Sequence, residues 1–400
     1  KTVESPIRDM VMNVPVFGSS TIITKLRVQL IPDPERIRLG LEASGVVSSD
    51  TVATSGPAKF RNQGQSSFVA RKLVVFGPGG MQEWPAVAHA DNNYSNLVAM
   101  ETNFDGVPLV GPLVRNIART QHDDAQGEAQ FEIERKVATR ARDQFDQEVR
   151  PHLAKLTSKI QSKRVAAIER LGLEFVPVAL STTEDRAVAR LRLASSQQLG
   201  AHTPRPQAPS DSWLSLQIHQ SALNNVLEQL DLDGRSFALV DLFSWVGEKL
   251  NRNTAANRDD LPDNVHLKFA KTDAVRLRCE SGRMEVIFAL AELSQGRNHW
   301  RNFSVHAFYV PQPQGLDARF VRDSTISLEG KTVKGAQPLL RAIFSKVLSR
   351  NRDLRLLDEQ FIADPRMKDL KISQFLLEDG WIGLAYSPVR AAGTVARKPK

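Results

Sequence analysis

The sequence predicts an α+β protein of two tandem domains, each a long, curved antiparallel sheet packed around amphipathic helices. Three observations support this class. Apolar and polar residues alternate over long stretches of both halves, a long helical run lies in the first half, and a Pro-rich stretch divides the chain. Alternation with a period of two indicates sheets with one apolar and one wet face, which is typical of antiparallel sheets.

Strands are expected first in the N-terminal half. Residues 1–20 show no clear periodicity, and Pro6, Pro15 and Gly18 argue against a long element there. Beyond them, apolar residues such as Leu26 and Val28 alternate with basic and polar ones. The predicted strands cover residues 23–30, 37–43, 67–76 and 96–103, with a turn at the Pro-Asp-Pro sequence 32–34.

Helices follow, a short apolar one at residues 111–119 and a long amphipathic one at 128–171. Pro151 is expected to kink the long helix or to begin a second one, because it removes a hydrogen-bond donor. A coiled-coil arm is the alternative, but the apolar spacing is nearer 3.6 than 3.5 residues per turn. Strands at 173–180 and 187–193 close this half. The apolar stripe consists of Val137, Ala141, Phe145, Val149, Leu153, Leu156 and Ile160.

The second half repeats this order, which predicts an internal duplication. Its strands lie between residues 274 and 328, its later helix at 337–344, and its closing strand pair at 370–377 and 381–386. The expected domains are residues 1–195 and 213–388, joined by a Pro-rich linker at 196–212 and followed by a basic tail at 389–400.

The charge balance favours anionic partners. The chain has 53 Lys and Arg against 45 Asp and Glu, a net charge of +8. We therefore expect weak, salt-sensitive contact with anionic membrane surfaces through the basic tail and the outward residues Arg36, Arg38, Arg276 and Arg278. A merely solvated basic surface is the alternative. The sequence has no zinc-finger spacing and no aromatic–basic interleaving, so we expect no specific nucleic-acid recognition.

Motifs for catalysis or cofactors are missing from the sequence. Residues 330–332 read Gly-Lys-Thr, but Thr325 stands where a phosphate-binding loop would have its first glycine. The His-Asp-Asp sequence at 122–124 is the only tight histidine–carboxylate cluster, and adjacent side chains point in different directions. The single cysteine, Cys279, excludes an internal disulfide and a site built from several thiolates. We therefore predict no enzymatic activity, no cofactor and no metal.

One segment carries a resemblance to a known family. Residues 216–227 read Leu-Gln-Ile-His-Gln-Ser-Ala-Leu-Asn-Asn-Val-Leu, a short strand leading into a helix with a small residue and an Asn. Together with the tandem curved sheets, this resembles the tubular lipid-binding superfamily, which includes bactericidal/permeability-increasing protein. The resemblance is topological and covers most of residues 20–388; the chain also resembles a bacterial envelope protein. It implies that helix and sheet enclose an apolar groove for acyl chains, in a periplasmic or envelope-associated protein.

We therefore expect non-enzymatic binding or transport of lipid or another apolar ligand in the bacterial envelope. The alternative is a structural or assembly protein of the envelope that binds a protein partner and no ligand. A polysaccharide hydrolase ranks third, because it would need two inward carboxylates and the inward faces are apolar. The residues expected to line the grooves are Leu113, Ile117, Phe145 and Val149 in the first half, and Phe288, Leu290, Leu340 and Phe344 in the second. These side chains could instead pack solidly against one another, since close packing is usual for apolar faces.

Overall fold

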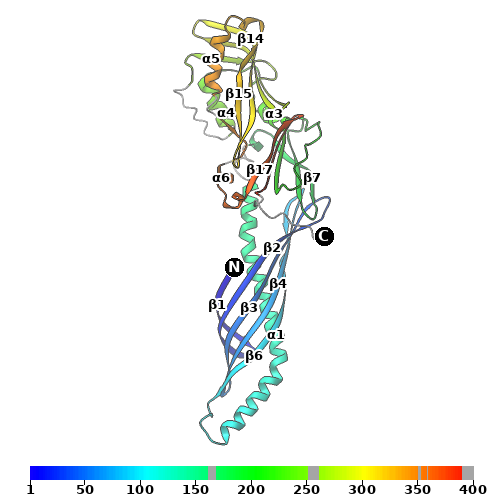
Figure 1. Ribbon diagram of the computed structural model, residues 1–400, viewed down its shortest axis with the longest axis vertical. Coiled ribbons are helices and arrows are strands. Elements are labelled where there is room, and N and C mark those ends of the chain that lie inside the picture. Colours follow the sequence, from blue (N-terminus) through cyan, green and yellow to red (C-terminus); the bar gives the residue numbers. More distant parts are fainter. Residues whose placement is uncertain (161–167, 251–260, 350–352, 358, 390–400) are drawn as a thin grey trace, which may run out of the picture. The chain divides into compact units, whose positions relative to one another are not determined.

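The computed structural model describes residues 1–160, 168–250, 261–349, 353–357 and 359–389. The chain forms two compact units (Figure 1). The first is Lys1–Ile160 with Pro177–Leu191, and the second comprises the described parts of Gln161–Val176 and Arg192–Lys400. Both units contain long, curled antiparallel sheets and helices, which confirms the predicted α+β class with two domains. The expected basic tail lies outside the described residues, except for Val389.

The sheet of the first unit is an antiparallel meander of six strands. The strands follow one another in space in the order β1-β2-β3-β4-β5, and β6 also pairs with β4. The turn at 32–34 falls between β2 and β3, as expected. The strands are β1 (Thr2–Val11), β2 (Val14–Ile31), β3 (Ile37–Ser55), β4 (Ala58–Gly77), β5 (Gly80–Glu83) and β6 (Val87–Thr102).

The expectation of no long element in residues 1–20 is wrong. Pro6 lies in β1, which ends the strand order, and there the missing N–H of a proline can face away from the ladder. Pro15 is the second residue of β2, before the pairing with β3 begins at Val16. Gly18 allows the close approach of β2 to β3, because a Cβ atom there would lie 2.1 Å from the carbonyl oxygen of Asp50.

One helix takes the place of the two that were expected. Helix α1 runs for 51 residues, from Val110 to Ile160, and contains Pro151. At 1.5 Å per residue it is about 77 Å long. The 20 residues of β4 extend over about 65 Å, so helix and strand are comparable in length. The helix lies along one face of the sheet, against β4 and β6 (Figure 1).

The two units divide within a two-stranded hairpin, β7 (Glu174–Thr182) and β8 (Ala187–Ala194). Its part in the first unit is held at the β2–β3 turn. Asp33 and Thr182 exchange two backbone hydrogen bonds of 2.9 and 2.8 Å. The hydroxyl of Thr182 also accepts from the N–H of Arg38 at 2.9 Å.

The main sheet of the second unit is also antiparallel. It has the order β10-β11-β13-β14-β15-β16, and β12 pairs with β13. Helices α4 (Leu239–Lys249) and α5 (Gln337–Val347) pack against its apolar face, with Val246 and Phe344 among the contacts. The strands are β10 (Ser236–Ala238), β11 (Val265–Phe269), β12 (Val275–Glu280), β13 (Arg283–Gln295), β14 (Asn298–Gln314), β15 (Asp317–Glu329) and β16 (Leu354–Arg355), and a short helix α6 (Glu359–Ile362) follows.

A separate three-stranded sheet closes the second unit. Strand β9 (Leu214–His219) pairs with β18 (Trp381–Pro388), which pairs with β17 (Leu370–Glu378). The residues expected to form a linker lie along this unit. Gln198 donates to the carbonyl of Asn225 in helix α3 (Gln220–Glu228) at 3.2 Å, and Thr203 donates to the carbonyl of Asp379 at 2.6 Å. The helices expected to correspond differ in length, with 51 residues in α1 and 11 in α5. The internal duplication stays a prediction.

Candidate apolar binding surface

The side of the first sheet that faces α1 can be read from the strand register. Val28 pairs with Leu41, and Leu41 pairs with Lys72. Directly paired residues share a face, and alternate residues of a strand share it too. Lys72 bonds to Asp146 of α1, so this whole row lies on the helix-facing side.

Small residues bring the helix close to the sheet. Phe145 of α1 is buried in a cluster with Ala43, Ala70 and Ala86. Leu41, Ala88 and Val149 pack against the edge of this cluster. Because the residues opposite the helix are two alanines of the sheet and one of the β5–β6 connection, one aromatic ring fills the gap between the layers.

Lys72 is the buried charge of this interface. Only 3% of its side chain is exposed, and its ammonium group lies 2.7 Å from Asp146 and 3.0 Å from Glu83. Burial alone would lower the pKa of Lys72, but the hydrogen bonds and charges of both carboxylates raise that pKa above its ordinary value. Asp146 also accepts from the backbone N–H of Ala86, at 3.1 Å. The group therefore fastens α1 to β4 and to the β5–β6 connection.

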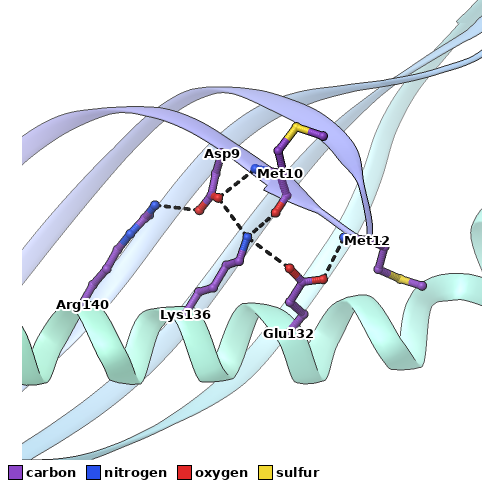
Figure 2. Close-up of polar contacts among 6 residues, drawn as sticks. All are labelled: Asp9, Met10, Met12, Glu132, Lys136 and Arg140. Carbon is purple, nitrogen blue, oxygen red and sulfur yellow. Dashed lines mark hydrogen bonds and ion pairs between the residues drawn. The ribbon is translucent and has the colours of Figure 1, made fainter.

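A second polar group fastens α1 to the β1–β2 hairpin (Figure 2). Lys136 lies 2.9 Å from Asp9 of β1 and 3.1 Å from Glu132, while Arg140 lies 2.6 Å from Asp9. Glu132 accepts from the N–H of Met12 in the hairpin turn, at 2.7 Å. Burial raises the pKa of Asp9, but the Lys136 hydrogen bond and the nearby cations bring it below its ordinary value. These bonds fix the helix to β1, the strand at the end of the sheet order.

Beyond Leu41 the apolar row continues without a cover. Leu26 and Val28 of β2 are 66% and 68% exposed, although they lie on the helix-facing side beside Ala43 and Leu41. We call Leu26, Val28, Leu41 and the neighbouring Phe145 and Val149 the apolar strip. Exposed apolar side chains that adjoin a buried cluster mark a surface for an apolar partner.

The strip contains two of the four residues expected to line a groove in the first half. Phe145 and Val149 meet Leu41 there. Leu113 and Ile117 are 61% and 51% exposed near the start of α1. Ile117 and Phe145 are 28 residues apart, or about 42 Å along a helix, so the structure does not bring the two pairs together.

The four residues expected in the second half lie in one large core. Leu290, Leu340 and Phe344 are buried, and Phe288 packs against them. Leu340 has no exposed surface. These side chains follow the close-packing alternative, and their part in ligand binding stays a prediction. The candidate surface is therefore in the first unit.

One hydrogen-bond network on the main sheet of the second unit joins a serine, a histidine and a glutamate, which are residue types that also occur in catalytic sites. The hydroxyl of Ser304 lies 2.7 Å from Nε2 of His306, whose Nδ1 lies 2.7 Å from Glu285. Activated nucleophiles in enzymes have the same arrangement, in which a carboxylate orients the base that lies beside the hydroxyl. Here the network links neighbouring positions of β13 and β14, and we assign it the structural role of holding these two strands together.

The basic residues expected on outer faces are largely paired. Arg36 and Arg38 lie 3.4 and 3.7 Å from Asp33, and Arg276 pairs with Asp273.

Among the described residues, no group of three or more His, Cys, Asp or Glu side chains is placed to hold a metal ion. None of the helices in the described ranges is both long and apolar enough to cross a membrane.

Comparisons with known proteins give little at the level of sequence. No protein-family model and no curated protein matches the chain. Among solved structures, the chain is similar to the one titled "Crystal structure of lipopolysaccharide binding protein", with a TM-score of 0.35 and 10% sequence identity. The match covers 98% of this chain and 92% of that one. At this TM-score the similarity carries no argument about function.

Proposed function

We propose that the protein binds a lipid or another apolar ligand, without catalysis, on the apolar strip of its first unit. One observation carries the proposal: Leu26 and Val28 are two-thirds exposed on the side of the sheet where their neighbours are buried against α1. Covering a valine or leucine side chain is worth about 1.5–3 kcal/mol, so an acyl chain lying on this strip is stabilised. The ion pairs of Lys72 and Asp9 hold the helix that forms one border of the strip.

The test compares two faces of the same strand. Val28→Asp places a charge on the strip, whereas Ile23→Asp is a matched control on the opposite face, where Ile23 is 53% exposed. We expect a fluorescent sixteen-carbon fatty acid to bind the wild type and Ile23→Asp equally, and to bind Val28→Asp at least about tenfold more weakly. Organic extraction and mass spectrometry of the purified variants should give the same order. Equal binding by all three proteins, or binding by none, would rule out the strip.

A protein partner is the second candidate, and one feature of β2 favours it. Thr24 exchanges backbone hydrogen bonds with Lys1, at 2.9 and 3.0 Å, and this ends the pairing with β1. Beyond it, the described residues place a strand on only one side of Lys25–Ile31, so alternate backbone groups from Leu26 onward point to an open edge. An added strand from a partner would pair there.

Val28→Pro tests this alternative, because it removes an N–H that points to the open edge and spares the ladder with β3. A synthetic seven-residue peptide of alternating apolar and acidic residues is a suitable probe by calorimetry. Binding that Val28→Pro abolishes, together with no fatty-acid binding, would replace the lipid proposal by the partner one.

An exported, envelope-associated location remains part of this proposal. Two points support it, the sequence resemblance and the fit of an apolar surface to a lipid-rich compartment. Fractionation of the native cells with an antibody against the protein tests it, and recovery with cytosolic markers would contradict it.

A further inference from the structure

The opposite face of the first sheet has a hollow of its own. Its volume is about 300 Å³, and it lies over Gly40 of β3, where the sheet lacks a side chain. The side chains around it come from β2, β4 and the start of β6, with one tryptophan from the β5–β6 connection. They are Gln29, Ile31, Leu73, Trp84 and Val87, and Leu41, Glu42, Arg71, Lys72 and Pro85 also border the hollow.

The strand register places this hollow on the outer face. Gln29 pairs with Gly40, which pairs with Leu73, and each is one residue away from the helix-facing row of Val28, Leu41 and Lys72. The hollow and the exposed pair Leu26 and Val28 therefore lie on opposite faces of the sheet, with Leu41 bordering both sites.

The lining is mostly apolar and includes exposed side chains. Trp84 is 44% exposed and Val87 is 74% exposed, so two large apolar residues border a concave surface with water on it. An apolar cavity of about 150 Å³ is enough to hold a benzene molecule. The hollow over Gly40 therefore has room for a stretch of one acyl chain.

Positive charge adjoins the hollow on the same face. Arg27 pairs with Glu42, and Glu42 pairs with Arg71, so two guanidinium groups and one carboxylate form the next row of the sheet. Arg71 uses its Nε to bond Glu42 at 2.8 Å, and its side chain is 73% exposed. A guanidinium carries four further N–H donors. The row can therefore bind one anionic group beside the hollow, with charge-assisted hydrogen bonds.

We propose that the hollow over Gly40 binds a single-chain anionic amphiphile of the fatty-acid type, with its chain against Trp84 and its carboxylate at Arg71 and Arg27. This site is separate from the apolar strip and goes beyond the function proposed above. Its basic row favours an anionic over a neutral chain.

Trp84 supplies the readout. Dibromostearate quenches tryptophan fluorescence on contact, and the part of the quenching lost in Trp84→Phe belongs to this site. Gly40→Val fills the hollow at little strain, because the three atoms nearest to a Cβ atom at residue 40 all belong to side chains, and the first, at 3.3 Å, is the flexible end of Ile31. Ser44→Val is the matched control, since it adds the same side chain to the same face of β3, four residues away.

We expect Gly40→Val to weaken the Trp84-dependent quenching about tenfold, Gly40→Ala to have a smaller effect, and Ser44→Val to have none. Arg71→Gln should weaken binding of dibromostearate about fivefold and leave its methyl ester unchanged. Circular dichroism of each variant confirms that the sheet is intact. The inference would be overturned if Gly40→Val left the quenching unchanged, or if the acid and the ester bound equally. It would also be overturned if Trp84 were quenched only by brominated lipid in anionic vesicles and not by free dibromostearate.

The two lipid proposals fail separately. Val28→Asp should leave the Trp84 signal unchanged, because Val28 lies on the other face of the sheet. Loss of that signal in Val28→Asp would mean that the hollow is not an independent site.

Discussion

Replacing Lys72 by methionine should loosen α1 from the sheet. The methionine keeps the unbranched apolar stem but removes the charge that lies 2.7 Å from Asp146 and 3.0 Å from Glu83. Removing one partner of a buried ion pair costs about 3–5 kcal/mol, because the other charge is left without its counterion. Asp146 keeps its hydrogen bond from Ala86, and Glu83 is 34% exposed, so water can solvate it. We therefore expect a loss near the lower limit, about 3 kcal/mol.

The double variant Lys72→Met/Asp146→Asn shows whether the penalty comes from the orphaned charge. The asparagine oxygen can still accept from Ala86, but it carries no charge. We expect the double variant to be more stable than Lys72→Met by about 1 kcal/mol or more, because it has no unpaired buried charge at residue 146. Lys25→Met is the control, because Lys25 is exposed and its replacement should change stability by less than about 0.5 kcal/mol.

The assay must report on α1 itself, since the two units need not unfold together. Native-state hydrogen exchange, followed by mass spectrometry on peptides from the middle of α1, gives the local opening free energy. A loss below 1 kcal/mol in Lys72→Met, far short of the roughly 3 kcal/mol expected, would refute the role given to this lysine. A double variant no more stable than the single one would refute the charge argument.

Four further predictions follow from the described contacts. Asp9→Asn should weaken the contact of β1 with α1 by about 2 kcal/mol, seen as faster hydrogen exchange in β1, and unchanged exchange would contradict it. His219 caps α3 and its pKa is lowered by burial and by His202, so the unfolded chain binds the proton more readily; stability should fall as the pH drops below about 6.5, and His219→Asn should abolish that fall. Phe344→Trp should destabilise the second unit by about 1–3 kcal/mol by overpacking, measured by denaturation, and should leave fatty-acid binding unchanged if the strip is the site. A fluorophosphonate probe should not label Ser304, and stoichiometric labelling would indicate a hydrolase.

The sequence predicted which face of a strand each side chain lies on better than it predicted which of these side chains are covered. Alternation placed Leu26 and Val28 on one side of β2, and the register with β3 confirms that they share it with Leu41. Alternation carries no information on which rows of a face a helix will cover. Leu340 was therefore expected in a groove although the structure buries it completely, while the exposed pair on β2 was not selected.

Three further features were missed, two of them because they depend on residues far apart in the sequence. Lys72 reads as an ordinary exposed lysine until Asp146, 74 residues later, is placed beside it. Strand β1 was discounted because of its proline, which an edge strand tolerates. The hollow over Gly40 has no sequence signature, since it needs Ile31, Leu73 and Trp84 from three different segments around one glycine.

Site-specific photo-crosslinking tests the central claim most directly. A benzophenone side chain at position 28 faces the apolar strip, and the same side chain at position 23 faces the opposite side of β2. The protein is produced in its native host, irradiated and analysed intact by mass spectrometry. We predict an added mass of one lipid or other small apolar molecule at position 28 and none at position 23. Equal adducts at both positions, or only protein crosslinks at position 28, would contradict the account.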